Sequence, residues 1–356
     1  MKKRYLCTLK YLRMTERNFV KKIMQNPVYL AITGIVGAVL LFFLVLYLAV
    51  PSYRFDESEP FHGEFVFNPY QEVDSNQFAN PIYIDFRSES IENHGVNACE
   101  YGFAMTGTRF LCLGYKDVRK MDYPFLQSIH YKQYNLDKLN KTARLVAPAH
   151  PSKGFKKGEF ANLDHYRVIE ALSENDNSLY YWDIALSNGH RANIIASCEK
   201  AGFTTACLSD DEPESIYKSL ETGNSYGVRF KNNPNEVPVL EYVTFRNDTI
   251  SVYVSDKAKE IRFIGQNAVT KETEKNSNQA FYVFKNDDSY IRTEIEFEDG
   301  NTLYLNPIVR HQYQYFFDPD HAFVMKGRTY LMWAVYIIVV VAYFYRVVKN
   351  RKKSSL

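Results

Sequence analysis

The sequence lacks the short motifs that mark several large enzyme classes. It contains no G-x-S-x-G segment, no Walker phosphate-binding segment and no cysteine–histidine spacing typical of zinc fingers. Its stretch SNGH, at residues 187–190, is better explained as the end of a helix than as a phosphate loop. Serine hydrolases, P-loop nucleotide hydrolases and zinc-finger proteins are therefore not supported. No internal repeat or low-complexity segment points to a repeat protein either.

Cysteine is also scarce, with five residues in 356. Four of them, Cys99, Cys112, Cys198 and Cys207, fall in the long central part of the chain. Cys112 sits in the apolar run FLCLGY, which is typical of a buried free thiol. Cys198 and Cys207 are nine residues apart and could bridge a local loop. Spacing alone does not determine which cysteines pair, so the disulfide state stays open.

Charge is absent from two long apolar runs. Residues 28–50 form a run of 23 uncharged residues, and residues 329–345 form a run of 17. A helix needs roughly 20 such residues to cross a bilayer core, with a range of about 17–25. We therefore predict two transmembrane helices, with the lipid bilayer as one partner of the chain.

The distribution of charge predicts the orientation. Residues 1–26 hold eight Lys or Arg and one acid, and residues 346–356 hold five Lys or Arg and no acid. Since the chain has a net charge of +2, residues 51–328 carry −10. The positive-inside rule then places both termini in the cytoplasm, with residues 51–328 on the periplasmic side of an inner (cytoplasmic) membrane. An acidic central part also disfavours nucleic acid as a partner.

The two cytoplasmic ends differ in pattern. In residues 1–27, apolar residues recur at roughly helical spacing between lysines and arginines. This indicates either a basic amphipathic helix lying on the anionic leaflet or a simple basic tail that sets the topology. Residues 346–356 are predicted to be a short basic tail that ends the second span.

The central part of the chain shows two patterns of apolar residues. Residues 51–235 alternate short apolar runs with helical stretches, which predicts parallel β/α units. Residues 236–310 show period-two alternation with turn signals such as Asp299-Gly300, which predicts a small all-β sandwich. Residues 311–328 are rich in aromatics and are predicted to be a juxtamembrane segment.

One histidine holds a position typical of a functional site. The stretch LVAPAHP, residues 145–151, predicts a buried strand that Pro151 ends, so His150 lies at its C-terminal end. Many α/β folds place their chemistry there. His150 is therefore a candidate metal ligand, or the remnant of one.

Six stretches together resemble the polymerase-and-histidinol-phosphatase (PHP) family, and more specifically a membrane-anchored branch with a C-terminal β-sandwich. They are NPYQ at 68–71, DYPFLQSIHYKQ at 122–133, APAHP at 147–151, YYWDIALSNGH at 180–190, SIYKSLETGNSYGV at 215–228 and YIRTEIEFEDGNTLYLNPI at 290–308. The resemblance implies a distorted (β/α)7 barrel followed by the sandwich, flanked by the two membrane helices. It also implies a site of two or three divalent metals at the strand ends, which hydrolyses phosphate esters.

The ligands that the resemblance implies are largely missing. The first strand, NPIYIDF, offers Tyr83 and Asp85 where the family has a His-x-His motif. Glu100 and His150 match family ligands, whereas Arg109 stands where a further histidine is expected. The final Asp-x-His motif has no counterpart after residues 191–195. These five residues form the remnant site, in which only His150 and Glu100 remain as candidate metal ligands.

Three functions stay open. The first is a catalytically degenerate PHP-like protein, a pseudoenzyme with an extracytoplasmic scaffold or assembly role and no cofactor. Its partner would be another membrane protein or further copies of the chain. The second is a membrane-bound phosphoesterase that uses zinc, manganese or magnesium on an envelope metabolite or lipid head group. The third is an extracytoplasmic carbohydrate- or peptide-binding module.

Overall fold

The computed structural model consists of two compact units. One is formed by Met1–Ser52 with Met325–Leu356, and the other by Tyr53–Val324. The structure describes residues 26–48, 50–87, 94–102, 106–116, 127–173, 176–198, 202–313 and 320–354. The predicted amphipathic segment 1–27 lies almost wholly outside the described residues.

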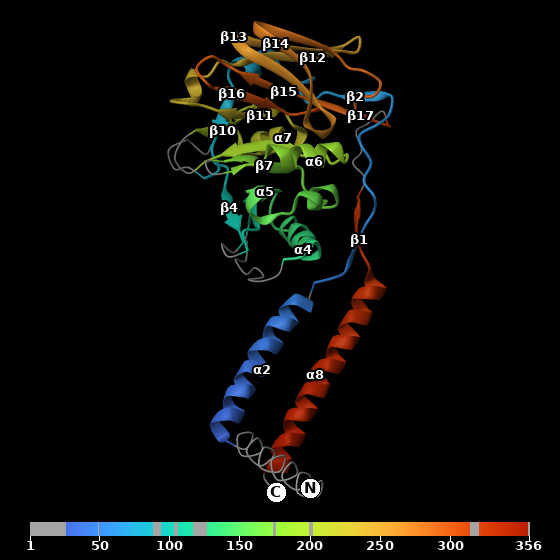
Figure 1. Cartoon of the computed structure of the whole chain (residues 1–356). Coiled ribbons are helices and arrows are strands. Elements are labelled where there is room, and N and C mark those ends of the chain that lie inside the picture. The colour runs from blue at the N-terminus through green and yellow to red at the C-terminus, as the bar shows by residue number, and fades with distance from the viewer. Residues whose placement is uncertain are drawn as a thin grey trace, which may run out of the picture. The chain divides into compact units, whose positions relative to one another are not determined.

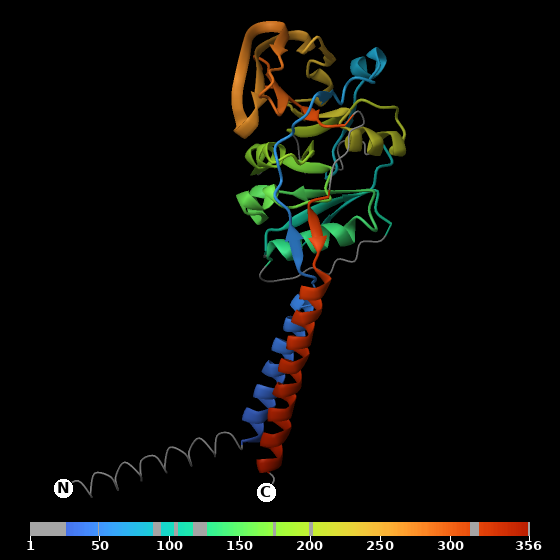
Figure 2. The same ribbon diagram turned by 90° about the vertical axis from the view of Figure 1, so that its right-hand side faces the viewer.

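The first unit contains two helices, α2 (Pro27–Leu48) and α8 (Lys326–Ser354), which lie side by side (Figures 1 and 2). The Trp333 indole donates to the Leu48 carbonyl at 2.8 Å, and Tyr343 lies against Gly37. By length and composition, the part of α8 from Lys326 to Lys349 can cross a membrane, whereas the apolar part of α2 found among the described residues, Pro27–Phe42, is shorter. The span predicted at residues 28–50 therefore remains a prediction.

Helix α8 also continues beyond the predicted end of the span at residue 345. It includes most of the basic tail, as far as Ser354. The tail has neither proline nor glycine to stop a helix, and lysine and arginine are good helix formers.

The contact at Gly37 gives a test of the helix pair. In Gly37→Ile the new side chain would meet the Tyr343 ring, so we expect a loss of about 1–3 kcal/mol from overpacking. Thermal loss of ellipticity in detergent measures this. Gly34→Ile is the matched control, because nothing lies within 4 Å of a Cβ at Gly34. Equal effects of the two substitutions would contradict the packing of α2 on α8.

The second unit is a mixed α/β structure whose strands pair mostly antiparallel. Strands β4 (Ala98–Tyr101), β5 (Arg109–Leu113) and β6 (Leu145–Ala149) form one antiparallel sheet. Strands β7 (Val168–Ser173), β8 (Asp176–Asn177) and β9 (Asn193–Ser197) form another. The helical elements of this region are α4 (Ile129–Leu139), α5 (Pro151–Gly154), η1 (Lys157–Ala161), α6 (Leu179–Ser187) and α7 (Pro213–Thr222).

These pairings differ from the predicted parallel β/α units. Among the described strands, only β7 and β9 pair in parallel, and α6 supplies their crossover. Residues 102–108 join β4 to β5, and a connection this short permits only antiparallel pairing. The described strands also fall into separate hydrogen-bonded sheets, so a closed seven-stranded barrel is not seen among them.

The largest sheet crosses the predicted domain boundary at residues 235 and 236. Strand β11 (Ser225–Arg229) pairs with β16 (Thr302–Leu305), with Tyr226 opposite Leu305. Residues on both sides of the boundary thus share one sheet and one compact unit. Its other strands are β2 (Phe65–Phe67), β3 (Ile82–Ile84), β10 (Phe203–Cys207), β12 (Leu240–Arg246), β13 (Thr249–Gly265), β14 (Val269–Val283), β15 (Tyr290–Glu296) and β17 (Ile308–His311).

Residues 236–310 form strands and short 3-10 turns, and the long strand β13 shows how their sheet bends. Its first residues pair with β12 and β14, and its last residues pair with β14 and β15. The register with β14 shifts between Tyr253 and Ala258, and such irregularities bend a strand. The sheet can therefore fold around one apolar core that includes Ile261 and Phe263 (Figure 2).

Smaller elements complete the second unit. Helix α3 (Ser75–Ala79) lies near β12, and strand β1 (Tyr53–Phe55) pairs with β18 (Ala322–Val324). The strand β18 falls within the predicted juxtamembrane segment 311–328. Short 3-10 turns, η2 (Pro234–Glu236) and η3 (Gln266–Ala268), connect the strands around them.

A buried ion pair joins the helical region to the large sheet. The Arg292 guanidinium on β15 donates two hydrogen bonds, of 2.8 Å each, to the Asp183 carboxylate on α6. Both side chains are only 4% exposed. The bidentate geometry and the burial make this pair a strong contact between two elements that are far apart in sequence.

Removing one partner of this pair should be costly. We expect Arg292→Met to lower the free energy of unfolding by about 3–5 kcal/mol, because the Asp183 charge would be left buried and unpaired. Urea denaturation measures the loss. The exposed pair Lys259–Glu296 supplies the control, and Lys259→Met should cost about 1 kcal/mol or less. Similar losses for both variants would contradict this role.

Candidate functional site

Charged side chains from several strands, some of them at strand ends, meet at one place in the second unit. Arg87 follows β3, Glu100 lies on β4, Arg109 begins β5, His150 follows β6 and Glu170 lies on β7. These five residues are called the arginine–glutamate cluster below. Strands β4 to β7 are successive neighbours in space, so residues far apart in sequence come within contact distance.

Arg87 occupies the middle of this cluster. Its Nε and Nη2 atoms donate to the two carboxylate oxygens of Glu170, at 2.7 and 3.0 Å. Its Nη1 atom donates to Oε2 of Glu100. One guanidinium therefore bridges two carboxylates with its planar fork of donors.

Glu170 has all its acceptor positions in use. Besides the two bonds from Arg87, it accepts the Ser197 hydroxyl at Oε1 and the His150 backbone N–H at Oε2, the latter at 3.2 Å. Its side chain is fully buried. A carboxylate offers about four lone-pair sites, so the buried charge of Glu170 is compensated on every side.

Glu100 lies nearer to the solvent and is shared by three neighbours. Arg109 Nη1 lies 2.6 Å from its Oε1, and His150 Nε2 lies 3.8 Å from its Oε2. Burial by itself would raise the pKa of Glu100, but Arg87, Arg109 and His150 hold that pKa below its usual value. Glu100 is therefore a carboxylate at neutral pH, and two guanidinium groups contact it.

His150 is neutral in this environment. The pKa of its imidazole lies below the usual value. Burial lowers this pKa most, Glu170 and Glu100 raise it, and Arg87 and Lys153 lower it. The imidazole Nδ1 lies 2.9 Å from the Ser173 hydroxyl oxygen. The His150 backbone is left-handed, with φ of 46°, a strain of about 1–3 kcal/mol that the Glu170 bond to its N–H helps to hold.

The structure brings some of the predicted site residues together and places another elsewhere. Glu100, Arg109 and His150 do come together, as the resemblance implied. Tyr83 does not join them, because it packs against the core of the large sheet.

Asp85 lies beside the cluster and positions its backbone. The Asp85 carboxylate accepts the N–H of Arg87 at 3.0 Å and that of Cys198 at 3.2 Å. The pair at the site is thus Asp85 and Arg87. This pair lies two residues further along the chain than the predicted pair, Tyr83 and Asp85. Sequence reasoning missed Arg87 and Glu170. A signal for Glu170 was present, because a lone acid inside the apolar run VIEALS indicates a buried, paired charge.

A second cluster lies at the strand pair β1–β18. Nδ1 of His165 is 2.7 Å from the Asp137 carboxylate, and Nε2 is 3.7 Å from Asp164 and 3.5 Å from Asp320. Among the described residues, ligand atoms that gather within 4.8 Å of one another are those of Asp164, His165 and Asp320, and not those around His150. These groups already bond protein atoms, so they form an ion-pair network.

This network ties down both strands. The Tyr53 hydroxyl on β1 donates to Asp137 at 2.5 Å. The Ala322 N–H on β18 donates to Asp164 at 3.3 Å. The hydrogen bond to Asp137 raises the pKa of His165 above its usual value, although burial lowers it.

The pKa shift of His165 predicts a pH dependence. A raised pKa stabilises the fold fully below the unfolded-state value of about 6.5, and this contribution is lost as pH rises through the folded-state pKa. We therefore expect the wild type to lose stability relative to His165→Gln between about pH 6 and pH 8. Denaturation at a series of pH values measures this. The control is His62→Gln, which changes an exposed imidazole. Stability curves for wild type and His165→Gln that stay parallel across this pH range would contradict the prediction.

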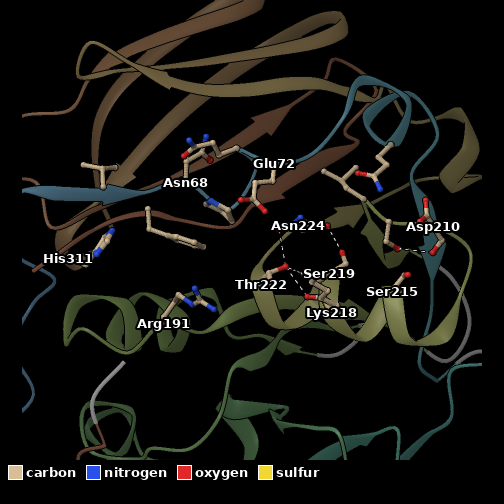
Figure 3. A pocket seen from close by; sticks show the side chains of 17 residues that line it. Asn68, Glu72, Arg191, Asp210, Ser215, Lys218, Ser219, Thr222, Asn224 and His311 are labelled. Atoms are coloured by element: carbon tan, nitrogen blue, oxygen red, sulfur yellow. Dashed lines mark hydrogen bonds between the residues drawn. The ribbon is translucent and has the colours of Figure 1, made fainter. Parts of the chain in front are cut away.

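A polar pocket of about 620 Å³ has no residue of either cluster in its lining, and Figure 3 shows it from close by. It is bounded by α7 and by the segment that follows β2. Arg191 lies with its guanidinium 4.9 Å from the Phe67 ring and donates to the Glu221 carbonyl at 3.0 Å. Amide and hydroxyl side chains line much of the rest, including Asn68, Gln71, Gln77, Ser215, Thr222 and Asn224.

Comparisons with protein-family models, curated proteins and solved structures give no match. The PHP resemblance therefore stays a prediction, and the geometry of the arginine–glutamate cluster carries the functional argument.

Proposed function

We propose that this chain is a catalytically degenerate, PHP-like membrane protein with an extracytoplasmic scaffold or assembly role. The observation that carries the proposal is the position of Arg87, whose guanidinium bridges Glu100 and Glu170 at the strand ends. In a metal-dependent phosphoesterase, carboxylates at such a place would hold divalent cations. Here two fixed cations, Arg87 and Arg109, contact the Glu100 carboxylate.

A guanidinium cannot replace a metal in the chemistry. It stays protonated, so it neither activates a water molecule nor serves as a general base. His150 keeps its imidazole near Glu100 but bonds Ser173, and no second histidine joins it in the described part of the cluster. The cluster can hold strand ends in place, and this function fits a rigid scaffold.

Membrane anchoring completes the proposal. The helix α8 has the length and apolar composition of a span, and α2 would be the second. We propose that both termini are cytoplasmic, that residues 51–328 are extracytoplasmic, and that a second membrane protein or further copies of the chain bind there. A fluorescent protein fused to the carboxyl terminus should be bright and an alkaline phosphatase fusion inactive. The reverse result would contradict this orientation.

Metal content tests the degenerate site. The purified full chain in detergent should hold fewer than one zinc, manganese or magnesium ion per chain by elemental mass spectrometry. Hydrolysis of a panel of phosphate esters should be equal for wild type and His150→Ala. Two or more tightly bound ions per chain, or an activity lost in His150→Ala, would favour the phosphoesterase.

The structural role of Arg87 has its own test. We expect Arg87→Met to lower the free energy of unfolding by about 3–5 kcal/mol, because the fully buried Glu170 would lose its charged partner. Arg109→Gln, at a half-exposed position, should cost about 1 kcal/mol or less. Chemical denaturation measures both. A stable Arg87→Met variant that gains a divalent ion would instead reveal a latent metal site.

The polar pocket favours a second candidate, an extracytoplasmic carbohydrate- or peptide-binding module. Its volume of about 620 Å³ falls within the usual range for small-molecule sites, roughly 300–1,000 Å³. Its amide and hydroxyl lining suits a ligand rich in hydroxyl or amide groups. A thermal-shift screen with saccharides and short peptides tests it, and Ser215→Trp, which would fill the pocket, should abolish any stabilisation.

A further inference from the structure

We infer that Cys99 and Cys112 are a redox pair that forms a disulfide across strands β4 and β5. The two residues lie directly opposite each other in the antiparallel register. Side chains opposite each other in such a pair point to the same face of the sheet, and both thiols pack with the same apolar cluster. The two residues are not joined by a disulfide in this structure.

The backbone geometry suits a disulfide. Two residues further along, the Gly114 N–H donates to the Asn97 carbonyl at 2.9 Å. Hydrogen-bonded pairs recur at every second residue, so Cys99 and Cys112 form such a pair, with Cα atoms about 5.5 Å apart. Disulfides span Cα distances of about 4.4–6.8 Å. The bond can therefore form without a change of register.

The two thiols differ in access. Cys112 is fully buried, and burial first and Cys99 second raise the pKa of its thiol. Cys99 is partly exposed and can meet an oxidant. The Cys99 thiolate would attack the disulfide of an oxidant such as oxidised glutathione, releasing one thiol. Cys112 would then attack the mixed disulfide and release the second thiol, so that two S–H bonds are exchanged for one S–S bond.

The other two described cysteines do not offer a comparable pair. The Cys198 thiol donates to the Phe203 carbonyl at 3.2 Å, at the start of β10. Cys207 is the last residue of β10, four residues and about 13 Å further along the strand. The local bridge between Cys198 and Cys207 that the spacing permitted therefore does not fit this fold.

The disulfide would act on the arginine–glutamate cluster. Among the described strands, β4 pairs only with β5, so it is an edge strand. Glu100 follows Cys99 directly and projects to the opposite face of β4. A covalent link between the strands would fix the edge strand that carries Glu100 beside Arg109 on β5. Oxidation would thus stabilise an edge strand that hydrogen-bonds to one neighbouring strand among the described residues.

The formation of this disulfide in cells rests on the proposed extracytoplasmic position of residues 51–328. Its formation in the purified chain does not depend on that position. The full chain in detergent is incubated with millimolar oxidised glutathione, blocked with N-ethylmaleimide and digested for mass spectrometry. We expect a peptide pair linked through Cys99 and Cys112, about 2 Da lighter than the two thiol peptides. Oxidation should raise the melting temperature by about 5–10 °C.

Matched variants make the result decisive. Cys99→Ser, at the partly exposed position, should abolish the linked peptide and the shift in melting temperature, whereas Cys207→Ser should keep both. Unlinked Cys99 and Cys112 in the oxidised, folded chain, or a link to Cys198, would overturn the inference. Thiols trapped in intact cells separate the two proposals. A pair that oxidises when purified but stays reduced in cells would contradict the extracytoplasmic position and leave the redox pair standing.

Discussion

The ion pair between Arg87 and Glu170 is the contact on which the arrangement of the strand ends depends. Glu170 lies fully buried, and a buried carboxylate is tolerated only when its charge is compensated. Arg87 supplies two bonds, and the Ser197 hydroxyl and the His150 backbone supply the others. The ends of β3, β6, β7 and β9 are thereby joined through one side chain.

This arrangement connects the scaffold interpretation to chemistry. Active sites of the type that the resemblance implies leave carboxylates free to bind cations from solution. Here the cations are part of the chain, and they cannot leave. The result is a neutral, internally paired cluster that fixes the strand ends. A similar principle recurs at Asp183 and Arg292, where a buried pair joins α6 to β15.

The fold is also more continuous than two successive domains would be. Strands β3, β10 and β11 belong to the same sheet as β12 to β17, so the helical region and the all-β region share backbone hydrogen bonds. Forces on one region therefore pass to the other without a flexible linker. This continuity suits a rigid surface presented to a partner better than it suits two domains that open and close.

The sequence by itself determined the local elements of this protein. Period-two alternation predicted the strands of residues 236–310, and the stretch SNGH predicted a helix end at Gly189, where φ is +78°. Uncharged runs predicted the helices α2 and α8. The position of His150 after β6 followed from a proline in an apolar run. All of these depend on neighbours within about ten residues, which periodicity and backbone sterics encode directly.

Only the tertiary structure decided which distant residues meet. Arg87 was overlooked because nothing near it in sequence shows that Glu100 and Glu170 lie within reach. Cys112 lies opposite Cys99 because of the antiparallel register of β4 and β5, and parallel β/α units would have separated them. Strand pairing and its direction are set by the packing of whole sheets around a common core. A change of one residue in register would move every one of these side chains to the other face.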